Sequence, residues 1–383
     1  MSRLTDVWVA APGEAAAAPR TYSSAPLPVV DWAGLGQTAP TPLPISYQGP
    51  NAPLPQADVV VLTWTSAEWS ALDHVFLNST TTRSMHDRDW QRNWHLYSRN
   101  APPPPPGQTG SPLWGYYQMV AITTTGGKSL NVLLLKCDSH LAHAPWYPGL
   151  AQMVTLILQD ARPHLVYSIG TAGGSREDLR LGDVVITNAA YLELQLAENT
   201  TTSPVNNQGF VATGAFPPAT LLSGAEAKLL FDMTQVVTTQ ALDYAVTQLH
   251  EQQPDSASFE LSDLLNSALS PDNLHDPRAV PMPGVQLLTT DFYYIADGSA
   301  EAARWAVLEM DDAVIAYVAG LQGVNYAFVR KISDPVLPSV TSSGVTIPPD
   351  VRKRWSGLIY EQFGLYTSFN GAITTWATIA AQG

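Results

Sequence analysis

The chain of 383 residues carries a formal net charge of −14 at pH 7, and hydrophobic residues make up 45% of it. It is long and apolar enough for one large domain with insertions or for two domains. Such acidity disfavours non-specific binding to nucleic acid or to an anionic membrane, although it leaves room for a local basic pocket. The single cysteine, Cys137, excludes an internal disulfide and is typical of a reducing compartment. We find neither a membrane-length apolar run nor a secretory signal, and we expect a cytoplasmic protein without nucleic-acid or membrane partners.

The N-terminal residues 1–56 are rich in Ala and Pro and show neither helical nor strand periodicity. They predict either an extended arm, lying on this chain or on a neighbouring subunit, or a disordered tail. We expect one α/β domain over residues 57–383, with insertions at about 78–112 and 197–284.

The first half of that domain predicts strands and helices in turn. The apolar run Val59–Leu62 indicates a buried parallel strand, and Thr65 or Ser66 can cap the helix that follows. Apolar runs on both sides of Gly126 and Gly127 predict a β-hairpin, and a helix follows over about 148–161. The stretch VYSIGTAGGSREDLRLGDVVIT, residues 166–187, then predicts a strand, a tight glycine crossing and a second strand.

The second half is less regular at first. We expect a loop over 199–218 and helices over about 221–252 and 259–269. The remaining expected elements are a strand over 285–290, a short apolar run over 305–309, a helix over 311–321, a strand over 325–332 and a last helix from 351 to about 381. Strands that alternate with helices predict an α/β fold with a mainly parallel or mixed central sheet.

Acidic residues recur where predicted strands end or helices begin: Glu68, Asp291, Glu309, Asp311 and Asp334. In an open α/β sheet such positions meet at one rim. Each residue alone can be a helix cap or a solvated charge, whereas a cluster suits acid–base chemistry or binding of sugar hydroxyls. The nearby group of Cys137, Asp138, His140 and His143 matches no zinc signature, and we expect neither a metal nor a cofactor.

Four motifs in this order resemble the nucleoside phosphorylase/nucleosidase superfamily: VVVLTWTSAEWSAL, LVYSIGTAGG with LGDVVI, LEMDDAVIAYVA and FVRKISD. Within it they are most similar to methylthioadenosine/adenosylhomocysteine nucleosidases and AMP nucleosidases. The resemblance covers residues 58–77, 132–192 and 285–369. It implies a nucleoside phosphorylase-like mixed sheet flanked by helices, a small-molecule purine nucleoside or nucleotide as partner, and a homo-oligomer.

The resemblance also implies roles for individual residues in catalysis and in binding of the ribose. Asp334 matches the general acid that protonates or hydrogen-bonds purine N7, and Ser333 would orient it. Glu68 matches the glutamate that activates water. Glu309 and Asp311 match the acidic residues that bind the ribose hydroxyls, with Met310 against the ribose face.

Further positions would form the rest of the nucleoside site. The segment that starts at Asp291 matches the one whose aromatic residue packs on the base, so that Tyr293 is the first choice and Phe292 the second. Ser139 falls where a serine or threonine contacts the ribose or the nucleophile. The glycine crossing would form the floor through Thr171, Ala172 and Gly173.

Two residues depart from the family pattern. Family members usually carry glutamate at Asp311, and the shorter aspartate would make its hydroxyl contact longer, water-mediated or re-aimed. Phosphorylases carry a phosphate-binding arginine where this chain has Ser168, and its absence favours water as the nucleophile. Arg176 could restore a phosphate site or could pair with the acidic residues that follow it.

The resemblance therefore predicts hydrolysis of the N-glycosidic bond of a purine nucleoside or nucleotide, with adenine as the first choice of base. The products would be the free base and a ribosyl compound. Two alternatives stay open: a phosphate-dependent phosphorylase, and a sensing module that binds nucleosides or nucleotides without catalysis.

The insertion RSMHDRDWQRNWHLYSR, residues 83–99, interleaves arginines with tryptophans and histidines. It predicts either a packed or subunit-contacting segment, or a lid whose Arg88 and Arg92 bind a substrate 5′-phosphate. Arg330 and Lys331 precede Asp334 and predict either a structural ion pair or electrostatic tuning of the acid.

Overall fold

The computed structural model describes residues 25–78, 80–84, 87–103, 112–216, 229–265, 269–274 and 276–382. Its central strand is β2 (Val59–Thr63), whose five residues are all buried. Strand β2 pairs in parallel with β5 (Ser129–Cys137) and with β6 (Leu165–Gly173), and β6 pairs in parallel with β13 (Asn325–Asp334). A strand that is covered on both faces needs apolar residues at successive positions, which explains the sequence VVVLT.

The other strands extend this frame into a mixed sheet of 13 strands among the described residues. Strand β4 (Gly115–Thr123) pairs antiparallel with β5, as the predicted hairpin requires, and β1 (Thr41–Pro42) and β3 (His95–Tyr97) pair with β4. The remaining strands are β7 (Val184–Thr187), β8 (Ala189–Glu193), β9 (Gln208–Val211), β10 (Ala279–Pro281), β11 (Gln286–Thr290) and β12 (Leu308–Glu309).

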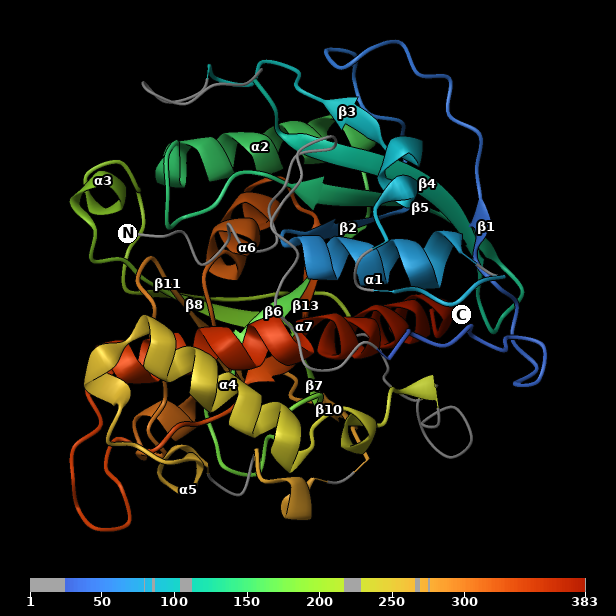
Figure 1. The fold of residues 1–383 in the computed structure, drawn as a ribbon. Coiled ribbons are helices and arrows are strands. Elements are labelled where there is room, and N and C mark those ends of the chain that lie inside the picture. The colour runs from blue at the N-terminus through green and yellow to red at the C-terminus, as the bar shows by residue number, and fades with distance from the viewer. Residues whose placement is uncertain are drawn as a thin grey trace.

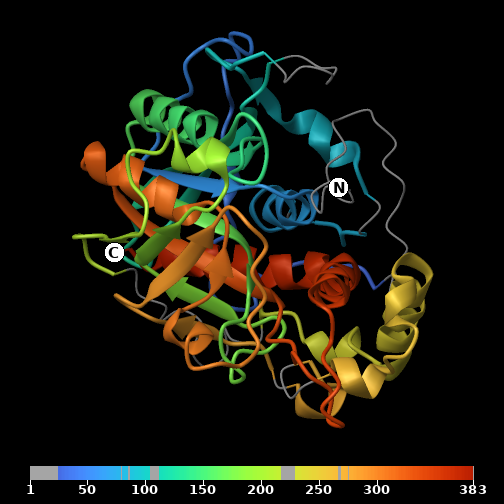
Figure 2. The same ribbon diagram turned by 90° about the vertical axis from the view of Figure 1, so that its left-hand side faces the viewer.

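Helices cover both faces of this sheet (Figures 1 and 2). On one face, α1 (Ser66–Leu77), α4 (Thr239–Gln252) and α7 (Pro349–Ala380) pack in one apolar core with Val59 and Val61. On the other face, α2 (Trp146–Ala161) and α6 (Asp312–Leu321) share a second core with Val60 and Leu62. Successive residues of β2 therefore point into opposite cores, because strand side chains alternate.

Short helices complete the fold. They are α3 (Ala197–Thr200), α5 (Leu261–Leu264) and the 3-10 helices Asp89–Asn93, Met233–Gln235, Pro254–Ser256, Pro271–Asn273 and Ala302–Arg304. No helix within the described ranges combines the length and the apolar character needed to cross a bilayer.

The predicted α/β class is confirmed, as are the hairpin, the strand–glycine–strand stretch and the helices that became α1, α2, α6 and α7. The region 197–284 differs from the prediction. The expected loop over 199–218 contains strand β9, and α4 begins at Thr239 rather than near residue 221. Thr238 sets that start, because its side chain accepts a hydrogen bond from the Ala241 N–H at 3.2 Å. Within the second predicted helix, 259–269, the described part forms the short α5 (Leu261–Leu264). Residues 221–228 of the first predicted helix and 266–268 of the second lie outside the described residues.

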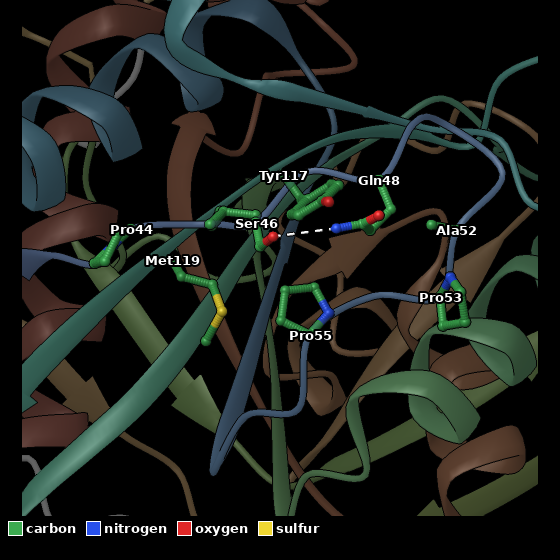
Figure 3. A pocket seen from close by; sticks show the side chains of 9 residues that line it. Pro44, Ser46, Gln48, Ala52, Pro53, Pro55, Tyr117 and Met119 are labelled. Carbon is green, nitrogen blue, oxygen red and sulfur yellow. Dashed lines mark hydrogen bonds between the residues drawn. The ribbon is translucent and has the colours of Figure 1, made fainter.

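The described part of the N-terminal arm, residues 25–56, lies on its own chain. The Trp32 ring meets Trp376 of α7 with centroids 4.5 Å apart, and the Tyr366 hydroxyl donates to the Ala25 carbonyl. A hollow between the arm and β4 is lined by residues that include Pro44, Ser46, Gln48, Pro55, Tyr117 and Met119 (Figure 3). None of its lining residues is among the predicted site residues.

Candidate active site

The glycine crossing after β6 makes room for a buried arginine. Gly170 pairs in register with Arg330 of β13, and a Cβ atom on Gly170 would lie 2.0 Å from Arg330 Nη1. Arg330 is 4% exposed, and its Nε donates to Asp312 Oδ2 at 2.7 Å. Its Nη2 donates to Ser168 Oγ at 2.7 Å and lies 3.2 Å from Glu309 Oε2. Ser168, which departs from the phosphorylase pattern, therefore serves as a hydrogen-bond acceptor for this guanidinium.

Glu68 lies in the first turn of α1 and is 2% exposed. Its carboxylate accepts hydrogen bonds from the Thr63 hydroxyl and from the backbone N–H groups of Trp64, Thr65 and Thr171. Glu68 also forms a capping box, because its own N–H donates to the Thr65 hydroxyl. The Glu68 side chain thus both caps α1 and serves as the predicted functional carboxylate.

An ion pair completes the surroundings of Glu68. Lys331 Nζ lies 3.2 Å from Glu68 Oε1, and both side chains are almost fully buried. Burial alone would raise the pKa of Glu68, but Lys331 and the backbone N–H donors outweigh it and hold that pKa well below its usual range. Burial outweighs the same ion pair at Lys331 and lowers its pKa to about 8. Glu68 is therefore a fixed anion.

Asp334 has a different environment. It ends β13 at a register irregularity beside Gly173, whose added Cβ would lie 3.3 Å from Asp334 Oδ2. Its Oδ1 accepts a hydrogen bond from the Ser333 hydroxyl at 2.7 Å, and its Oδ2 accepts from Ser356 at 3.0 Å and Tyr293 at 3.2 Å. Burial raises the pKa of Asp334, and these hydroxyl donors oppose the rise only in part.

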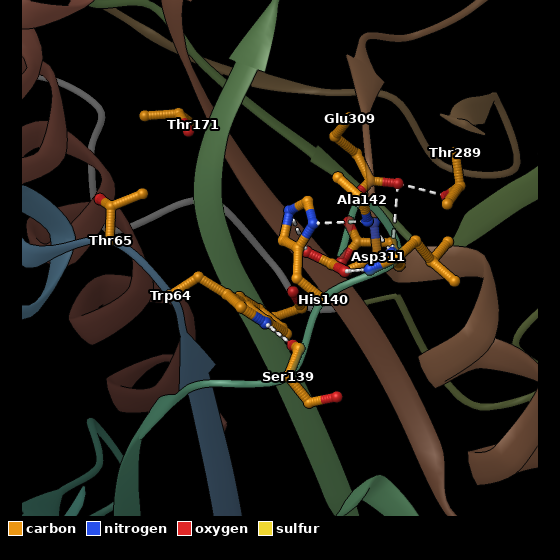
Figure 4. Close-up of polar contacts among 12 residues, drawn as sticks. Trp64, Thr65, Ser139, His140, Ala142, Thr171, Thr289, Glu309 and Asp311 are labelled. Carbon is orange, nitrogen blue, oxygen red and sulfur yellow. Dashed lines mark hydrogen bonds and ion pairs between the residues drawn. The ribbon is translucent and has the colours of Figure 1, made fainter. Parts of the chain in front are cut away.

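Asp311 is turned toward a histidine (Figure 4). Its Oδ2 lies 3.2 Å from His140 Nε2, and its Oδ1 accepts from the Leu141 N–H at 3.3 Å. Because His140 Nδ1 accepts from the Ala142 N–H at 3.0 Å, the proton of the neutral ring is on Nε2 and points to Asp311. Burial and then the neighbouring His143 lower the pKa of His140 to about 3, so the ring stays neutral.

Glu309 links this group to Arg330. Its carboxylate accepts the Asp311 N–H at 2.7 Å and the hydroxyl of Thr289 (Figure 4). Burial and the charge of Asp312 raise the pKa of Glu309 to about 7. Burial and the charge of Glu309 likewise raise the pKa of Asp311. The two predicted sugar-binding residues are thus in contact through the Asp311 N–H, and the charge of Glu309 acts on Asp311.

The other predicted residues have mixed surroundings. Met310 and Phe292 are partly exposed, and the Phe292 ring meets Tyr294 edge-on with centroids 6.3 Å apart. Asp291 is buried and accepts hydrogen bonds from the backbone N–H groups of Gln195 and Leu196 and from the Asn199 side chain.

Ser139 is buried, and its hydroxyl has no hydrogen-bond partner within the described part of the chain. Its carbonyl accepts from the Trp64 indole at 2.8 Å (Figure 4). In the floor of the predicted site, Thr171 and Gly173 are partly exposed and Ala172 is buried.

Most arginines of the insertion have acidic partners. Arg83 forms a buried ion pair with Asp73, and Arg99 pairs with Asp160. Arg92 pairs with Asp89, with 82% of its side chain exposed, and Arg88 Nη1 donates to the Asp87 carbonyl. The pairs of Arg83 and Arg99 hold both ends of the segment to the domain, whereas the pair of Arg92 lies at the surface.

The tryptophans of the insertion pack against α1. The rings of Trp90 and Trp94 meet Trp69 edge-on, with centroids 4.9 and 5.5 Å away. His86, also part of the predicted basic patch, lies outside the described residues.

Sequence reasoning missed Asp312 and Ser356. Asp312 directly follows Asp311 in the motif LEMDD, so the doubled acid was a visible signal for an ion-pair partner. Ser356 offered no such signal, because it is one of several hydroxyl residues in the last helix. Within the described residues no group of three or more His, Cys, Asp or Glu side chains is arranged to hold a metal ion.

A sequence profile described as the Phosphorylase superfamily matches residues 147–345, just over half of the chain. The chain therefore belongs to the phosphorylase superfamily. The matched range includes the glycine crossing, Arg330 and Asp334. A search of curated proteins finds no significant match to the chain.

Several solved structures are similar to the chain at low identity. One is 5′-methylthioadenosine/S-adenosylhomocysteine nucleosidase from Neisseria meningitidis with methylthio-immucillin-A: 13% identity, 84% of this chain and 98% of that chain covered, and a TM-score of 0.43. The Helicobacter pylori nucleosidase of the same name, with butyl-thio-DADMe-immucillin-A, has 12% identity, covers 85% and 98%, and has a TM-score of 0.43. S-adenosylhomocysteine nucleosidase from Streptococcus pyogenes with 5-methylthiotubericidin has 11% identity, covers 86% and 99%, and has a TM-score of 0.42.

The Gly170→Ala variant tests whether the glycine crossing exists to seat Arg330. The added Cβ would displace the guanidinium from Asp312 and Glu309, and we expect a loss of about 3 kcal/mol in the free energy of unfolding. Gly320→Ala is the control, because it lies in α6 with no atom within 4 Å of the added Cβ. We expect that change to be neutral or to stabilise by up to ~1 kcal/mol. Urea unfolding of both variants measures the difference, and equal stability would contradict the assignment.

Proposed function

We propose that this chain hydrolyses the N-glycosidic bond of a purine nucleoside or nucleotide and releases the free base. The observation that carries the proposal is the contrast between Glu68, which lies in the first turn of α1 and pairs with Lys331, and Asp334, which ends β13 and accepts from hydroxyl groups. The pKa of Glu68 is lowered and the pKa of Asp334 is raised. Opposed environments of this kind separate the charged group from the proton donor in an active site.

Asp334 serves as the general acid. Its raised pKa keeps a proton available, and transfer of that proton to purine N7 turns the base into a better leaving group. The electron pair of the glycosidic bond leaves with the base, and the sugar gains oxocarbenium character. The hydroxyl of Ser333 then stabilises the carboxylate that remains.

Glu68 supplies a negative charge that is already ionised in the fold. A carboxylate at this place stabilises the positive charge that develops on the sugar and orients the attacking water. Because its oxygens accept several donors and pair with Lys331, its contribution is electrostatic and positional more than basic.

Glu309 and Asp311 hold the ribose hydroxyls in this proposal. Asp311 is one methylene shorter than the usual glutamate, and His140 lies beside it at 3.2 Å. The imidazole is close enough to share a sugar hydroxyl with Asp311. Phe292, which is partly exposed, is placed to stack on the base.

Water is favoured over phosphate as the nucleophile. Ser168 replaces the phosphate-binding arginine and is engaged with Arg330. The next arginine along the chain, Arg176, pairs with both oxygens of Asp178 at 2.9 and 3.0 Å. Both cations are thus already matched by acidic groups.

Incubation with adenosine, methylthioadenosine and AMP, with and without inorganic phosphate, tests the reaction class. We expect free base to form at the same rate with and without phosphate, together with a free ribosyl product. Phosphate-dependent turnover that yields ribose 1-phosphate would overturn the hydrolase in favour of a phosphorylase. Tight binding without base release, measured by calorimetry at high protein concentration, would point to a sensing module.

The Asp334→Asn variant tests the assignment of the acid. The amide keeps the shape of the side chain but cannot give up a proton, so we expect kcat to fall by about 10²–10⁴-fold. Binding of the substrate should change much less, because the proton moves only in the transition state. A near-normal kcat for base release, in a variant whose thermal unfolding matches the parent, would show that another group is the acid.

A further inference from the structure

Two hydroxyl groups converge on one oxygen of Asp334. The Tyr293 hydroxyl lies 3.2 Å from Asp334 Oδ2, and the Ser356 hydroxyl lies 3.0 Å from the same atom. The two hydroxyls are also 2.6 Å from each other, and either one can be the donor. The three oxygens therefore form a triangle within hydrogen-bond distance, in which the two hydroxyl protons fill two of the three contacts at a time. Ser333 holds the other carboxyl oxygen at 2.7 Å.

The triangle joins parts of the chain that are far apart in sequence. Tyr293 follows β11, Asp334 ends β13, and Ser356 lies near the N-terminus of α7 with no exposed surface. The sequence predicted Tyr293 as the residue that stacks on the base. Its hydroxyl also links the far end of the ring to the predicted acid.

We propose that Tyr293 and Ser356 are a hydroxyl pair that positions Asp334 and stabilises its carboxylate once the proton has left. The proposal rests on the proposed function, in which Asp334 gives its proton to the base, and it adds two positioning residues to that reaction. No atom is exchanged with the pair: the proton moves from Asp334 to the base nitrogen, and the hydroxyl donors turn toward the oxygen that becomes charged.

The chemistry of the pair fits this role. Burial and the charge of Asp334 raise the pKa of Tyr293 well above its ordinary value, so the phenol remains protonated and can donate. Hydrogen bonds to a charged acceptor are stronger than those to a neutral one. The pair therefore favours the state of Asp334 after proton transfer more than the state before it, which is the requirement for lowering a barrier.

Two further titratable side chains of α7 lie near this triangle. Burial and the charges of Glu68 and Asp334 raise the pKa of Tyr360 in α7. The Tyr360 hydroxyl donates to Thr65 Oγ1 at 2.6 Å. Lys353, an exposed residue in the first turns of α7, holds its ammonium 5.5 Å from the centre of the Tyr293 ring. These groups can also change the pKa of Asp334. A matched control variant therefore separates their effect from the effect of losing the Tyr293 hydroxyl.

The experiment compares Tyr293→Phe and Ser356→Ala with Tyr294→Phe. Tyr294 is the next residue, partly buried, and its ring contacts Phe292 rather than Asp334. The first measurement is the pH dependence of kcat and kcat/KM for base release. Activity needs protonated Asp334, so it falls as the pH rises through the pKa of that group. Loss of a donor to the carboxylate raises this pKa, and the alkaline limb should move up by about 1 pH unit in Tyr293→Phe.

At the plateau of the pH profile we expect kcat to fall about tenfold in Tyr293→Phe and in Ser356→Ala, with KM nearly unchanged. The double variant should lose less than the product of the single losses, because each hydroxyl also supports the other. Tyr294→Phe should leave kcat and the alkaline limb as they are in the parent. An unmoved limb in Tyr293→Phe, or an equal shift in Tyr294→Phe, would overturn the proposal.

A second measurement needs no substrate and separates the two proposals. The pKa of Asp334 is followed in carboxyl-labelled protein by carbon NMR, with Asp334→Asn to assign the signal. We expect that pKa to rise in Tyr293→Phe and in Ser356→Ala but not in Tyr294→Phe. If the parent protein releases no base while this shift is present, the proposed function fails and the hydroxyl pair stands. If base is released and no shift is present, the pair fails and the function stands.

Discussion

The buried guanidinium of Arg330 is the group on which the rest of the site depends. A cation inside a sheet is tolerated only when it is paired and fully hydrogen-bonded. Here Asp312 of α6, Glu309 of β12 and Ser168 of β6 supply the partners, and Gly170 supplies the space. Since these partners come from separate elements, the single side chain fixes the relative positions of the strand ends around the site.

Different partners explain how the two carboxyl groups acquire opposite character. Lys331 reaches Glu68, whereas Asp334 receives only hydroxyl donors, although Lys331 and Asp334 lie close together on one strand.

The two pKa shifts have opposite effects on how the stability of the fold changes with pH. Ionised Glu68 stabilises the fold above its unfolded pKa of about 4.3, and this stability is lost as the pH falls. Asp334 has a raised pKa, so its ionised form costs stability as the pH rises. The structure thus gives up stability at the residue to which we assign proton transfer.

Much of this arrangement could be predicted from local sequence, and the rest depends on long-range contacts. The run VVVLT, the cap at Thr65 and the strand that ends at Asp334 follow from periodicity and helix-capping rules. The contact between Tyr293 and Ser356 joins residues 63 positions apart, and nothing in either neighbourhood encodes it. The insertion shows the same dependence on distant residues. Its sequence left open both packing and an anion-binding lid, and the buried ion pair of Arg83 needs Asp73, which lies in α1 and belongs to another motif.

The charge balance on β13 bears on the choice between water and phosphate. A phosphate dianion needs a cationic side chain that is not already paired with a carboxylate. Arg330 is matched by Asp312 and Glu309, and Lys331 is matched by Glu68. Freeing either cation for phosphate would leave a buried carboxylate without its partner, at a cost of about 3–5 kcal/mol. A neutral water molecule makes no such demand, because it needs only an acceptor and a donor. Ser168 belongs to the same arrangement as the buried pairs, because it gives Arg330 a hydrogen-bond acceptor and adds no further cation at that position.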